Sequence, residues 1–369
     1  MGVGQGALED LVSESNAWRG RPVLLTGHTG FSGGWLALWL HRLGASVHGY
    51  ALNPPTEPSF FEVCRVGPLL ASDTRADLAD RERLRSLFDA CAPEAVFHLA
   101  AQPLVREGYR DPLGTLATNV MGTAHVLDAA RAAASVRAVV IVTTDKVYEN
   151  REDGRPYRES DPLGGYDPYS ASKAAAEIVV ASYRASFFAP GGKPNVATAR
   201  AGNVMGGGDW AAERLVPDCL RAFAANQPVK LRYPKSVRPW QHVLDALHGY
   251  LRLGEHLLSR HGARFAKPWN LGPSAAGDAT VAELAQTVAR LWGNGARVEQ
   301  AAGAGNPHEA GLLQLDSRQA AAELGWSPRW SLQQALEQTV LWHRAWLRGS
   351  DMAAFSLGQI AAYEEACRA

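Results

Sequence analysis

The sequence predicts an α/β fold built on a doubly wound parallel sheet, followed by a smaller C-terminal substrate-binding lobe. Over about the first 200 residues, short apolar runs alternate with helical patterns, which is typical of βαβ units. A glycine-rich segment directly follows the first apolar run and opens a helix. After Arg200 the pattern becomes irregular, beginning with the loop Gly206–Trp210. These observations favour a Rossmann-type domain followed by a second lobe.

The expected elements follow from these patterns. Candidate strands are Pro22–Thr26, Ser46–Leu52, Leu69–Ala71, Ala95–Leu99, Ala138–Thr143 and Asn195–Ala199, and candidate helices begin near Phe31, Asp80, Pro112 and Tyr169. The later part shows helical patterns near Leu215–Ala225, at Val243–Ser259 and over most of Thr280–Leu347, with an extended piece at Val229–Tyr233.

These elements predict a domain organisation. We expect residues 21–202 to form the Rossmann domain, with a probable return segment at about 241–267. Residues 203–240 and 268–350 would form the second lobe, and residues 1–20 and 351–369 would be tails. The ligand cleft should lie between the lobes, at the carboxyl ends of the strands.

Composition excludes several classes of partner. Lys+Arg and Asp+Glu both count 37, so nothing predicts binding to nucleic acid or to an anionic membrane surface. The four cysteines lack the paired spacing of a metal or redox site, so no metal is expected. No apolar run reaches the roughly 18 residues of a membrane span, and the first twenty residues lack a signal-peptide pattern. We therefore expect a cytoplasmic protein.

The glycine-rich segment is the first candidate site. The apolar run 23–26 leads into a loop that contains Gly27, Thr29, Gly30, Phe31, Ser32 and Gly33, and then into the apolar helix 35–43. The glycines let the backbone approach a pyrophosphate, and the helix N-terminus supplies N–H donors. The alternative is an ordinary tight turn, but the strand–loop–helix context favours a dinucleotide.

Charges near the second strand bear on which dinucleotide binds. The strand end at 50–53 has no acid, and residues 44–63 contain no Lys or Arg that could meet a 2′-phosphate, which favours NAD over NADP. Asp73 and Asp77 could reach the adenosine, or they could be solvated loop acids; the sequence leaves both open.

A Tyr-xxx-Lys pattern supplies a candidate base. Tyr169 and Lys173 share one face of a helix, so the ammonium would favour the phenolate and lower a pKa that is normally about 10. The alternative is a surface pair on an amphipathic helix. The preceding strand, however, ends in Thr144, Asp145 and Lys146 at the ligand-facing edge of the sheet, which favours catalysis over a capped turn.

The motifs together resemble the extended short-chain dehydrogenase/reductase family, specifically its sugar-nucleotide 4,6-dehydratases that act on CDP-glucose. The resemblance runs from about Trp18 to Trp346. The segments that carry it are Thr26–Phe31, Tyr50–Pro58, His98–Arg106, Thr144–Asn150, Asp161–Gly165, Arg200–Trp210 and Val237–Val243. One departure is Ser32, where the family usually carries a lysine.

The resemblance implies NAD as a cofactor that is regenerated in each turnover. Tyr169, assisted by Thr144 and Lys173, would take the C4-hydroxyl proton during oxidation. Asp145 is the candidate acid and Lys146 the candidate base for loss of the C6 hydroxyl and the C5 proton, although related dehydratases carry Asp-Glu at this position.

The resemblance also implies binding residues. For the cofactor it adds Leu99, Ala100, Ala101 and Asn119 to the residues named above. For a nucleotide-diphospho-sugar it implies Gln102, Arg106, Tyr109, Asn203, Arg214, Leu215, Arg238, Trp240, His242 and His308. It further implies a homodimer formed through the helices that begin near Pro112 and Tyr169.

Three alternatives stay open. Another sugar-nucleotide dehydratase would share all of these motifs. An NAD-dependent 4-epimerase would share the loop and Tyr-xxx-Lys but would not need Asp145 and Lys146. A non-catalytic NAD-binding regulator of this fold would typically lose Tyr169 or Lys173, and both are present.

Overall fold

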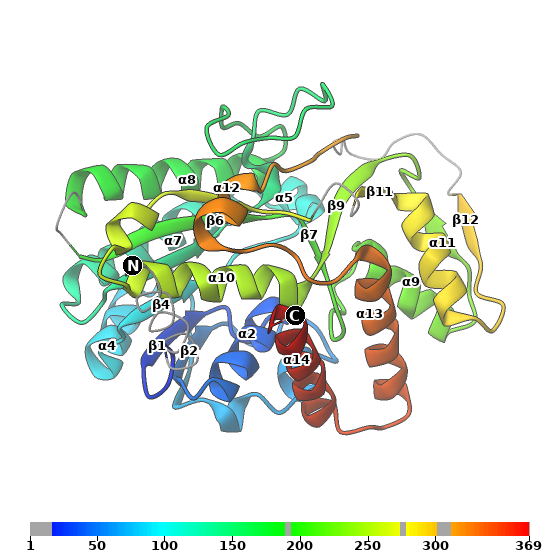
Figure 1. The fold of residues 1–369 in the computed structure, drawn as a ribbon, viewed down its shortest axis with the longest axis horizontal. Coiled ribbons are helices and arrows are strands. Elements are labelled where there is room, and N and C mark those ends of the chain that lie inside the picture. Colours follow the sequence, from blue (N-terminus) through cyan, green and yellow to red (C-terminus); the bar gives the residue numbers. More distant parts are fainter. Residues whose placement is uncertain (1–16, 189–192, 274–277, 301–310, 369) are drawn as a thin grey trace, which may run out of the picture.

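The computed structural model describes residues 17–188, 193–273, 278–300 and 311–368 (Figure 1). Its centre is a seven-stranded parallel sheet in the order β10-β6-β5-β4-β1-β2-β3. The strands are β1 (Pro22–Thr26), β2 (Ser46–Ala51), β3 (Ser72–Arg75), β4 (Ala95–His98), β5 (Ala138–Val142), β6 (Asn195–Ala201) and β10 (Pro268–Leu271). The order reverses between β1 and β4, so the predicted doubly wound fold is confirmed.

Helices cover both faces of the sheet because alternate strand residues point to opposite sides. On one face α2 (Phe31–Arg42) and α10 (Val243–Leu258) pack against residues such as Val23, Leu25 and Val140. On the other face α4 (Arg81–Cys91), α7 (Gly122–Ala132) and α8 (Pro168–Phe187) cover residues such as Leu24 and Val139. Two separate apolar cores therefore hold the sheet rigid.

The second lobe has its own core and lies at the right of Figure 1. It contains the three-stranded sheet β11-β9-β7 and the two-stranded sheet β12-β8. Its strands are β7 (Asn203–Met205), β8 (Val229–Leu231), β9 (Val237–His242), β11 (Asp278–Thr280) and β12 (Val298–Gln300). Its helices are α9 (Leu215–Ala224), α11 (Val281–Trp292) and α13 (Leu332–Leu347).

Shorter elements connect these layers. They are α3 (Phe60–Val63), η2 (Gly67–Leu69), α5 (Val105–Arg110), α6 (Pro112–Leu116), η3 (Ala117–Met121), η4 (Asp145–Val147), η5 (Gly262–Phe265) and α12 (Arg318–Leu324). The segment α6-η3 continues directly into α7, and η4 sits where β5 leaves the sheet.

The structure corrects three sequence-based boundaries. The expected strand Leu69–Ala71 is instead the end of the turn η2 and its exit, and the edge strand β3 begins at Ser72. Residues 351–369, expected as a tail, contain the helix α14 (Met352–Arg368), whose Ile360 and Tyr363 are buried and which lies beside α2 (Figure 1). The return to the main sheet extends beyond residue 267, because β10 pairs with β6.

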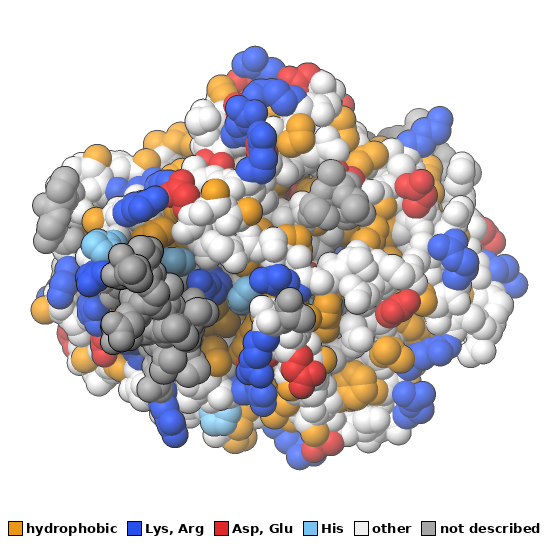
Figure 2. All heavy atoms as spheres, in the orientation of Figure 1, with side chains coloured by type: hydrophobic (Ala, Val, Ile, Leu, Met, Phe, Trp, Pro, Cys, Tyr) orange, Lys and Arg blue, Asp and Glu red, His pale blue; other side chains and the backbone are white. Residues whose placement is uncertain are grey.

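Charged side chains of both signs are visible on the face of the molecule shown in Figure 2. In Figure 2 Lys and Arg side chains are scattered over the face shown, with Asp and Glu side chains among them. None of the helices in the described segments combines the length and apolarity needed to cross a bilayer. Residues 1–16 of the expected tail 1–20 lie outside the described residues. Within the described part, Trp18 is buried and packs against Phe97.

Candidate active site

A cavity of about 780 Å³ lies between the carboxyl edge of the main sheet and the second lobe. Ser32 in the first turn of α2 and the segments after β4 and β5 line one side, together with α8. The other side comes from β7, β8, β9 and α9. Predicted site residues on its wall are Ser32, Leu99, Ala101, Arg106, Thr144, Lys146, Tyr169, Lys173, Asn203, Arg214, Leu215, Arg238 and Trp240.

The glycine-rich loop forms a tight backbone cradle. Gly27 has a φ of +79°, and a Cβ there would lie 2.6 Å from the backbone nitrogen of Ala100. A Cβ at Gly33 would lie 2.0 Å from the Gly27 carbonyl oxygen. Helix α2 begins at Phe31 without a side-chain cap, so no N-cap side chain accepts a hydrogen bond from its first N–H groups. This cradle fits the pyrophosphate of a dinucleotide.

Side chains around the loop hold it in place. Thr29 Oγ1 donates to the Leu52 carbonyl oxygen at 3.0 Å, which ties the loop to the end of β2. The Ala100 N–H donates to Thr26 Oγ1 at 3.2 Å, which fixes the chain after β4 against β1. Thr29 and Ala100 therefore shape the proposed cofactor site through the backbone.

Asp73 is engaged within the protein. It accepts hydrogen bonds from Arg75 at 2.7 Å and pairs with His28 at 2.8 Å. Partial burial alone would raise the pKa of Asp73, but the hydrogen bonds from Arg75 and His28 outweigh it and lower the pKa. Arg75 also lies 3.5 Å from the Leu52 carbonyl oxygen. It places a cation beside the end of β2, where residues 44–63 themselves contain no Lys or Arg, because Arg75 belongs to the neighbouring strand β3. Asp77 accepts from the Ala79 N–H at 2.8 Å, as a local turn acid does.

Tyr169 and Thr144 meet at the floor of the cavity. Their side chains share a hydrogen bond, which lowers the pKa of Tyr169, whereas burial raises it and dominates, giving a pKa of about 12. The expected lowering of the Tyr169 pKa is thus wrong for the protein alone. Burial of the phenol raises the pKa by more than the neighbouring groups lower it. Thr144 is 6% exposed and Tyr169 is 8% exposed.

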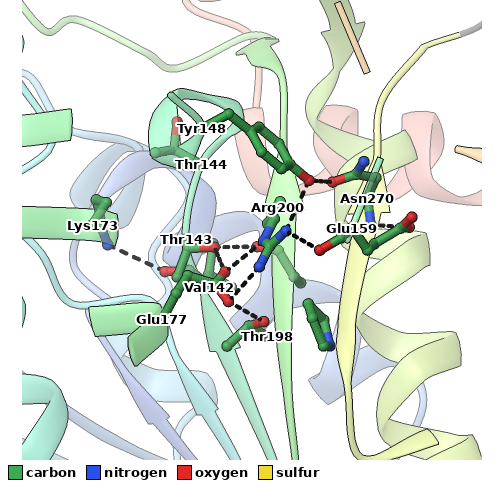
Figure 3. A network of polar contacts seen from close by, with 12 residues as sticks. Val142, Thr143, Thr144, Tyr148, Glu159, Lys173, Glu177, Thr198, Arg200 and Asn270 are labelled. Carbon is green, nitrogen blue, oxygen red and sulfur yellow. Dashed lines mark hydrogen bonds and ion pairs between the residues drawn. The ribbon is translucent and has the colours of Figure 1, made fainter. Parts of the chain in front are cut away.

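Lys173 stands one turn further along α8. Its Nζ donates to the Val142 carbonyl oxygen at 3.2 Å, a contact drawn at the left of Figure 3. Burial lowers the pKa of Lys173 to about 8, and the carboxylate of Glu177 opposes that shift. A lysine with this pKa is close to its titration range at neutral pH, which suits a group that modulates a neighbouring proton transfer.

Asp145 and Lys146 form an ion pair close to Tyr169. Lys146 Nζ donates to Asp145 Oδ1 and to Asn203 Oδ1, both at 3.1 Å, and Thr144 Oγ1 donates to Asp145 Oδ1 at 2.9 Å. Asp145 is fully buried behind the cavity wall, and its Oδ2 has no hydrogen-bond partner among the described residues. Lys146 is therefore the member of the pair that faces the cavity.

Two arginines on the cavity wall have acidic partners. Arg214 begins α9 and binds Asp209 at 3.0 Å. Arg106 lies 3.5 Å from Glu213, and Arg110 reaches the same carboxylate at 2.9 Å. Glu213 was not predicted; a non-glycine residue with a φ of +65° beside the cavity is a signal that only the structure supplies.

Several predicted residues lie outside the cavity wall. His242 is buried, caps α10 through the Leu244 N–H and packs between Trp35 and Trp330, so its role is structural. Gln102 bonds Thr115 and the backbone of Leu104. Asn119 is buried and donates to Ser172, so Gln102 and Asn119 stabilise the frame behind α8. Tyr109 is 38% exposed on α5, and His308 lies outside the described residues.

Four residues close to the predicted site were not among its predicted residues. Glu177, Arg200, Tyr148 and Asn270 form a buried polar network directly behind Lys173 (Figure 3). A glutamate one turn after Lys173 was the available signal, because it shares the helix face that points at the sheet. Among the described residues, no group of three or more His, Cys, Asp or Glu side chains is arranged to hold a metal ion.

Comparison with known proteins gives relatives along almost the whole chain. A family model described as GDP-mannose 4,6 dehydratase matches residues 24–339. The CDP-glucose 4,6-dehydratase of Salmonella typhimurium is 48% identical over 357 residues, which cover 96% of this chain and 99% of that protein. The dTDP-glucose 4,6-dehydratase of Streptomyces griseus is 30% identical over 278 residues, covering 74% and 78%.

Solved structures share the fold. A dTDP-glucose 4,6-dehydratase from Streptomyces venezuelae, solved with NAD and TYD bound, superposes with a TM-score of 0.76 at 24% identity, covering 90% of this chain and 99% of that one. A UDP-glucose 4-epimerase from Thermotoga maritima has a TM-score of 0.75 at 20% identity, covering 88% and 99%. The resemblance seen in the motifs is confirmed, and the chain belongs to the GDP-mannose 4,6 dehydratase family of short-chain-type sugar-nucleotide dehydratases.

Proposed function

We propose that this protein is a CDP-D-glucose 4,6-dehydratase, which converts CDP-glucose to CDP-4-dehydro-6-deoxy-D-glucose and water. The observation that carries the proposal is 48% identity to a CDP-glucose 4,6-dehydratase along nearly the full length of both chains. The chemistry that such a reaction needs is also present on one cavity. An oxidation group (Tyr169, Thr144, Lys173) and an elimination pair (Asp145, Lys146) lie side by side.

NAD is the cofactor we propose for the backbone cradle at Gly27 and Gly33, with Leu99 and Ala101 on its inner side. When bound, NAD would accept a hydride from C4 of the sugar and return it to C6. Arg75 does not argue for NADP, because Asp73 already binds its guanidinium through two nitrogens, at 2.7 and 2.8 Å.

The first step assigned to the protein is removal of the C4-hydroxyl proton. As the phenolate, Tyr169 would accept this proton, and the hydrogen bond with Thr144 supports the assignment because it favours the phenolate. The Lys173 ammonium, one helical turn away, favours the phenolate. A C4 ketone then makes the C5 proton acidic, which is what allows elimination to follow.

The second step uses the ion pair. Before elimination, a proton would pass from the Lys146 ammonium to the Asp145 carboxylate along their 3.1 Å hydrogen bond, giving a second form, amine and carboxylic acid, with the same net charge. In the second form, Lys146 can take the C5 proton while Asp145 supplies a proton to the departing C6 oxygen. Asp145 lies behind the cavity wall, so its proton would reach the sugar by one of two routes. Either the carboxyl group rotates so that Oδ2 turns towards the cavity, or Lys146 relays the proton.

The nucleotide end of the substrate is assigned to the second lobe. Arg214 and Arg238 line the cavity there, and guanidinium groups match the geometry of pyrophosphate oxygens. Asn203 links this end to the elimination pair through its bond with Lys146. Leu215 and Trp240 supply apolar wall.

Assembly as a homodimer in the cytoplasm is part of the same proposal. Apolar side chains are exposed along α6, η3 and α8: Leu113 at 77%, Met121 at 52% and Ile178 at 59%. A second copy that packed the same helices against these side chains would remove them from water. All four cysteines are free thiols, as expected of a reducing compartment.

The experiment is direct. Purified protein is incubated with NAD and, separately, with CDP-glucose, dTDP-glucose, UDP-glucose and GDP-mannose. The proposal expects a 4-keto-6-deoxy product with CDP-glucose as the preferred substrate. Interconversion of C4 epimers without loss of the C6 hydroxyl would instead show an epimerase, and preference for another nucleotide would reassign the substrate.

A further inference from the structure

Glu177 is a buried carboxylate in which every acceptor position is used. It lies on α8, one helical turn after Lys173, and is 2% exposed. Oε1 accepts from Thr143 Oγ1 at 2.6 Å and from Arg200 Nε at 2.9 Å. Oε2 accepts from Thr198 Oγ1 at 2.7 Å and from a second Arg200 nitrogen at 2.9 Å (Figure 3). A carboxylate held this way has one geometry available to it.

One of these bonds holds the chain directly before the oxidation group. Thr143 immediately precedes Thr144, the residue that bonds Tyr169, and its own N–H donates to the Ala199 carbonyl oxygen on β6. Thus Glu177 connects the helix that carries Tyr169 and Lys173 to the strand end that carries Thr144. A small shift of this carboxylate would move both at once.

Arg200 extends the network to the edge strand β10 of the main sheet. It is 2% exposed, donates to Tyr148 Oη at 2.9 Å and to the Glu159 carbonyl oxygen at 3.1 Å. Tyr148 Oη in turn donates to Asn270 Oδ1 on β10 at 2.5 Å. The ion pair therefore has a structural role across three strands, and any further role of Glu177 must be separated from it experimentally.

The charges around Lys173 come from several elements. On α8 itself Glu177 is the carboxylate that acts on it. From β4, His98 faces it; burial lowers the pKa of His98 to about 3, so this ring is neutral. From β6 comes Arg200, and from η4 and α9 come Asp145 and Arg214, which act on the adjacent Tyr169. Glu177 is thus the anion that acts directly on Lys173.

We propose that Glu177 is a positioning residue for the oxidation step: gripped by Arg200 and two threonines, it aligns Thr144 with Tyr169 and supplies the negative charge that keeps Lys173 an ammonium. No hydrogen bond from Glu177 to the sugar is involved. Its effect passes through Lys173 and Thr144, which line the cavity, whereas Glu177 does not.

The sign of the effect follows from the charges. Neutralising Glu177 leaves the buried Arg200 cation uncompensated behind Lys173 and removes the carboxylate that raises the pKa of Lys173. Both changes lower that pKa further below about 8. The ammonium is then lost at a lower pH, so the alkaline limb of the oxidation rate should move to lower pH by roughly one to two units, the scale of one charge at this range.

The test combines three variants of the full-length protein. Glu177→Gln removes the charge and nearly keeps the shape. Glu177→Asp keeps the charge and shortens the side chain. Glu177→Gln with Arg200→Met removes both charges of the pair. Glu323→Gln, at a surface carboxylate that binds Lys267 at 2.9 Å, is the matched control. Thermal unfolding identifies which variants fold.

Two readouts are needed. The first is NMR titration of ¹³C-labelled lysine side chains, with Lys173 assigned by Lys173→Met; it needs no substrate. The second is the pH dependence of bound reduced nicotinamide formed from CDP-glucose in a single turnover, and this part rests on the proposed function. If wild-type protein does not act on CDP-glucose, the proposed function fails while the lysine titration still decides the role of Glu177.

The expected result is a lower Lys173 midpoint and an alkaline limb shifted down in Glu177→Gln. The midpoint should return towards the wild-type value in the double variant, and it should stay near the wild-type value in Glu177→Asp, with a lower maximal rate. An unchanged midpoint in Glu177→Gln would overturn the proposal. So would an equal fall of the midpoint in Glu177→Asp, because the charge would then not be the cause.

Discussion

The ion pair of Lys146 and Asp145 gives the sharpest prediction about mechanism. Lys146→Met removes the only ammonium that donates to Asp145 among the described contacts and leaves the oxidation group of Tyr169, Thr144 and Lys173 intact. We expect oxidation of the sugar to proceed and elimination to stop. The protein should therefore accumulate bound reduced nicotinamide and form little product.

The magnitude follows from the geometry. At 3.1 Å, with an effective dielectric constant of about 20, two unit charges interact by about 5 kcal/mol. Losing a positioned proton-transfer group typically costs ~10²–10⁴-fold, or about 3–5 kcal/mol of barrier. The first figure measures how strongly the pair is held together, and the second gives the expected loss of rate, so elimination should be at least ~100-fold slower than in wild type.

The assay is a single-turnover experiment with CDP-glucose. Absorbance of reduced nicotinamide is followed while product is quenched and quantified. Lys267→Met, at a lysine bound to Glu323 away from the cavity, is the control for losing a lysine. Asp145→Asn should arrest at the same stage. Wild-type product formation by Lys146→Met would refute the assignment, and so would a defect in the oxidation step equal to the defect in elimination.

Three further predictions follow. Tyr169→Phe should lower turnover by at least ~100-fold, since it removes the base, while binding of CDP-glucose measured by calorimetry stays near wild type; near-normal turnover would contradict the assignment. Protein denatured after purification should release NAD(H), and recovery of mostly NADP(H) would show that Arg75 does bind a 2′-phosphate. Burial raises the pKa of Asp245 from 3.8 to about 6, so the folded protein loses stability as the pH rises through that window, by about 3 kcal/mol for this group. The free energy of unfolding of Asp245→Asn, measured by denaturant titration, should therefore rise relative to that of wild type as the pH increases from 4 to 7. A difference between the two proteins that does not change with pH would be evidence against the raised pKa of Asp245.

The sequence predicted the parts of the fold that depend on local pattern. The β1–loop–α2 unit and the Tyr169 helix were found because apolar runs, glycine spacing and i, i+4 pairing are local signals. The edge strand β3 was misplaced, because it is polar and half-exposed, while the apolar residues Leu69 and Leu70 before it belong to a turn. Helix α14 was missed because its small and polar residues give a weak amphipathic pattern, although Tyr363 anchors it through Asp245.

The residues of the candidate site likewise differ in how well local sequence patterns predicted them. Residues inside a motif, such as Thr144 and Lys173, lie on the cavity as expected. Arg75 approaches the Leu52 carbonyl oxygen beyond the neighbouring strand β2, and Glu177 binds Arg200 on β6, so spacing along one segment could not identify either contact. His242 lies in a recognisable motif, yet its burial against Trp35 and Trp330 makes it a helix cap and a packing residue.

The central claim is that one cavity oxidises C4 and then eliminates across C5 and C6. Turnover of CDP-glucose in deuterated water tests it most directly, because removal and return of the C5 proton exchange it with solvent. The account predicts a 4-keto-6-deoxy product that carries deuterium at C5, and Lys146→Met should form it at least ~100-fold more slowly. A product without deuterium at C5, or conversion to a C4 epimer that keeps its C6 hydroxyl, would contradict the account.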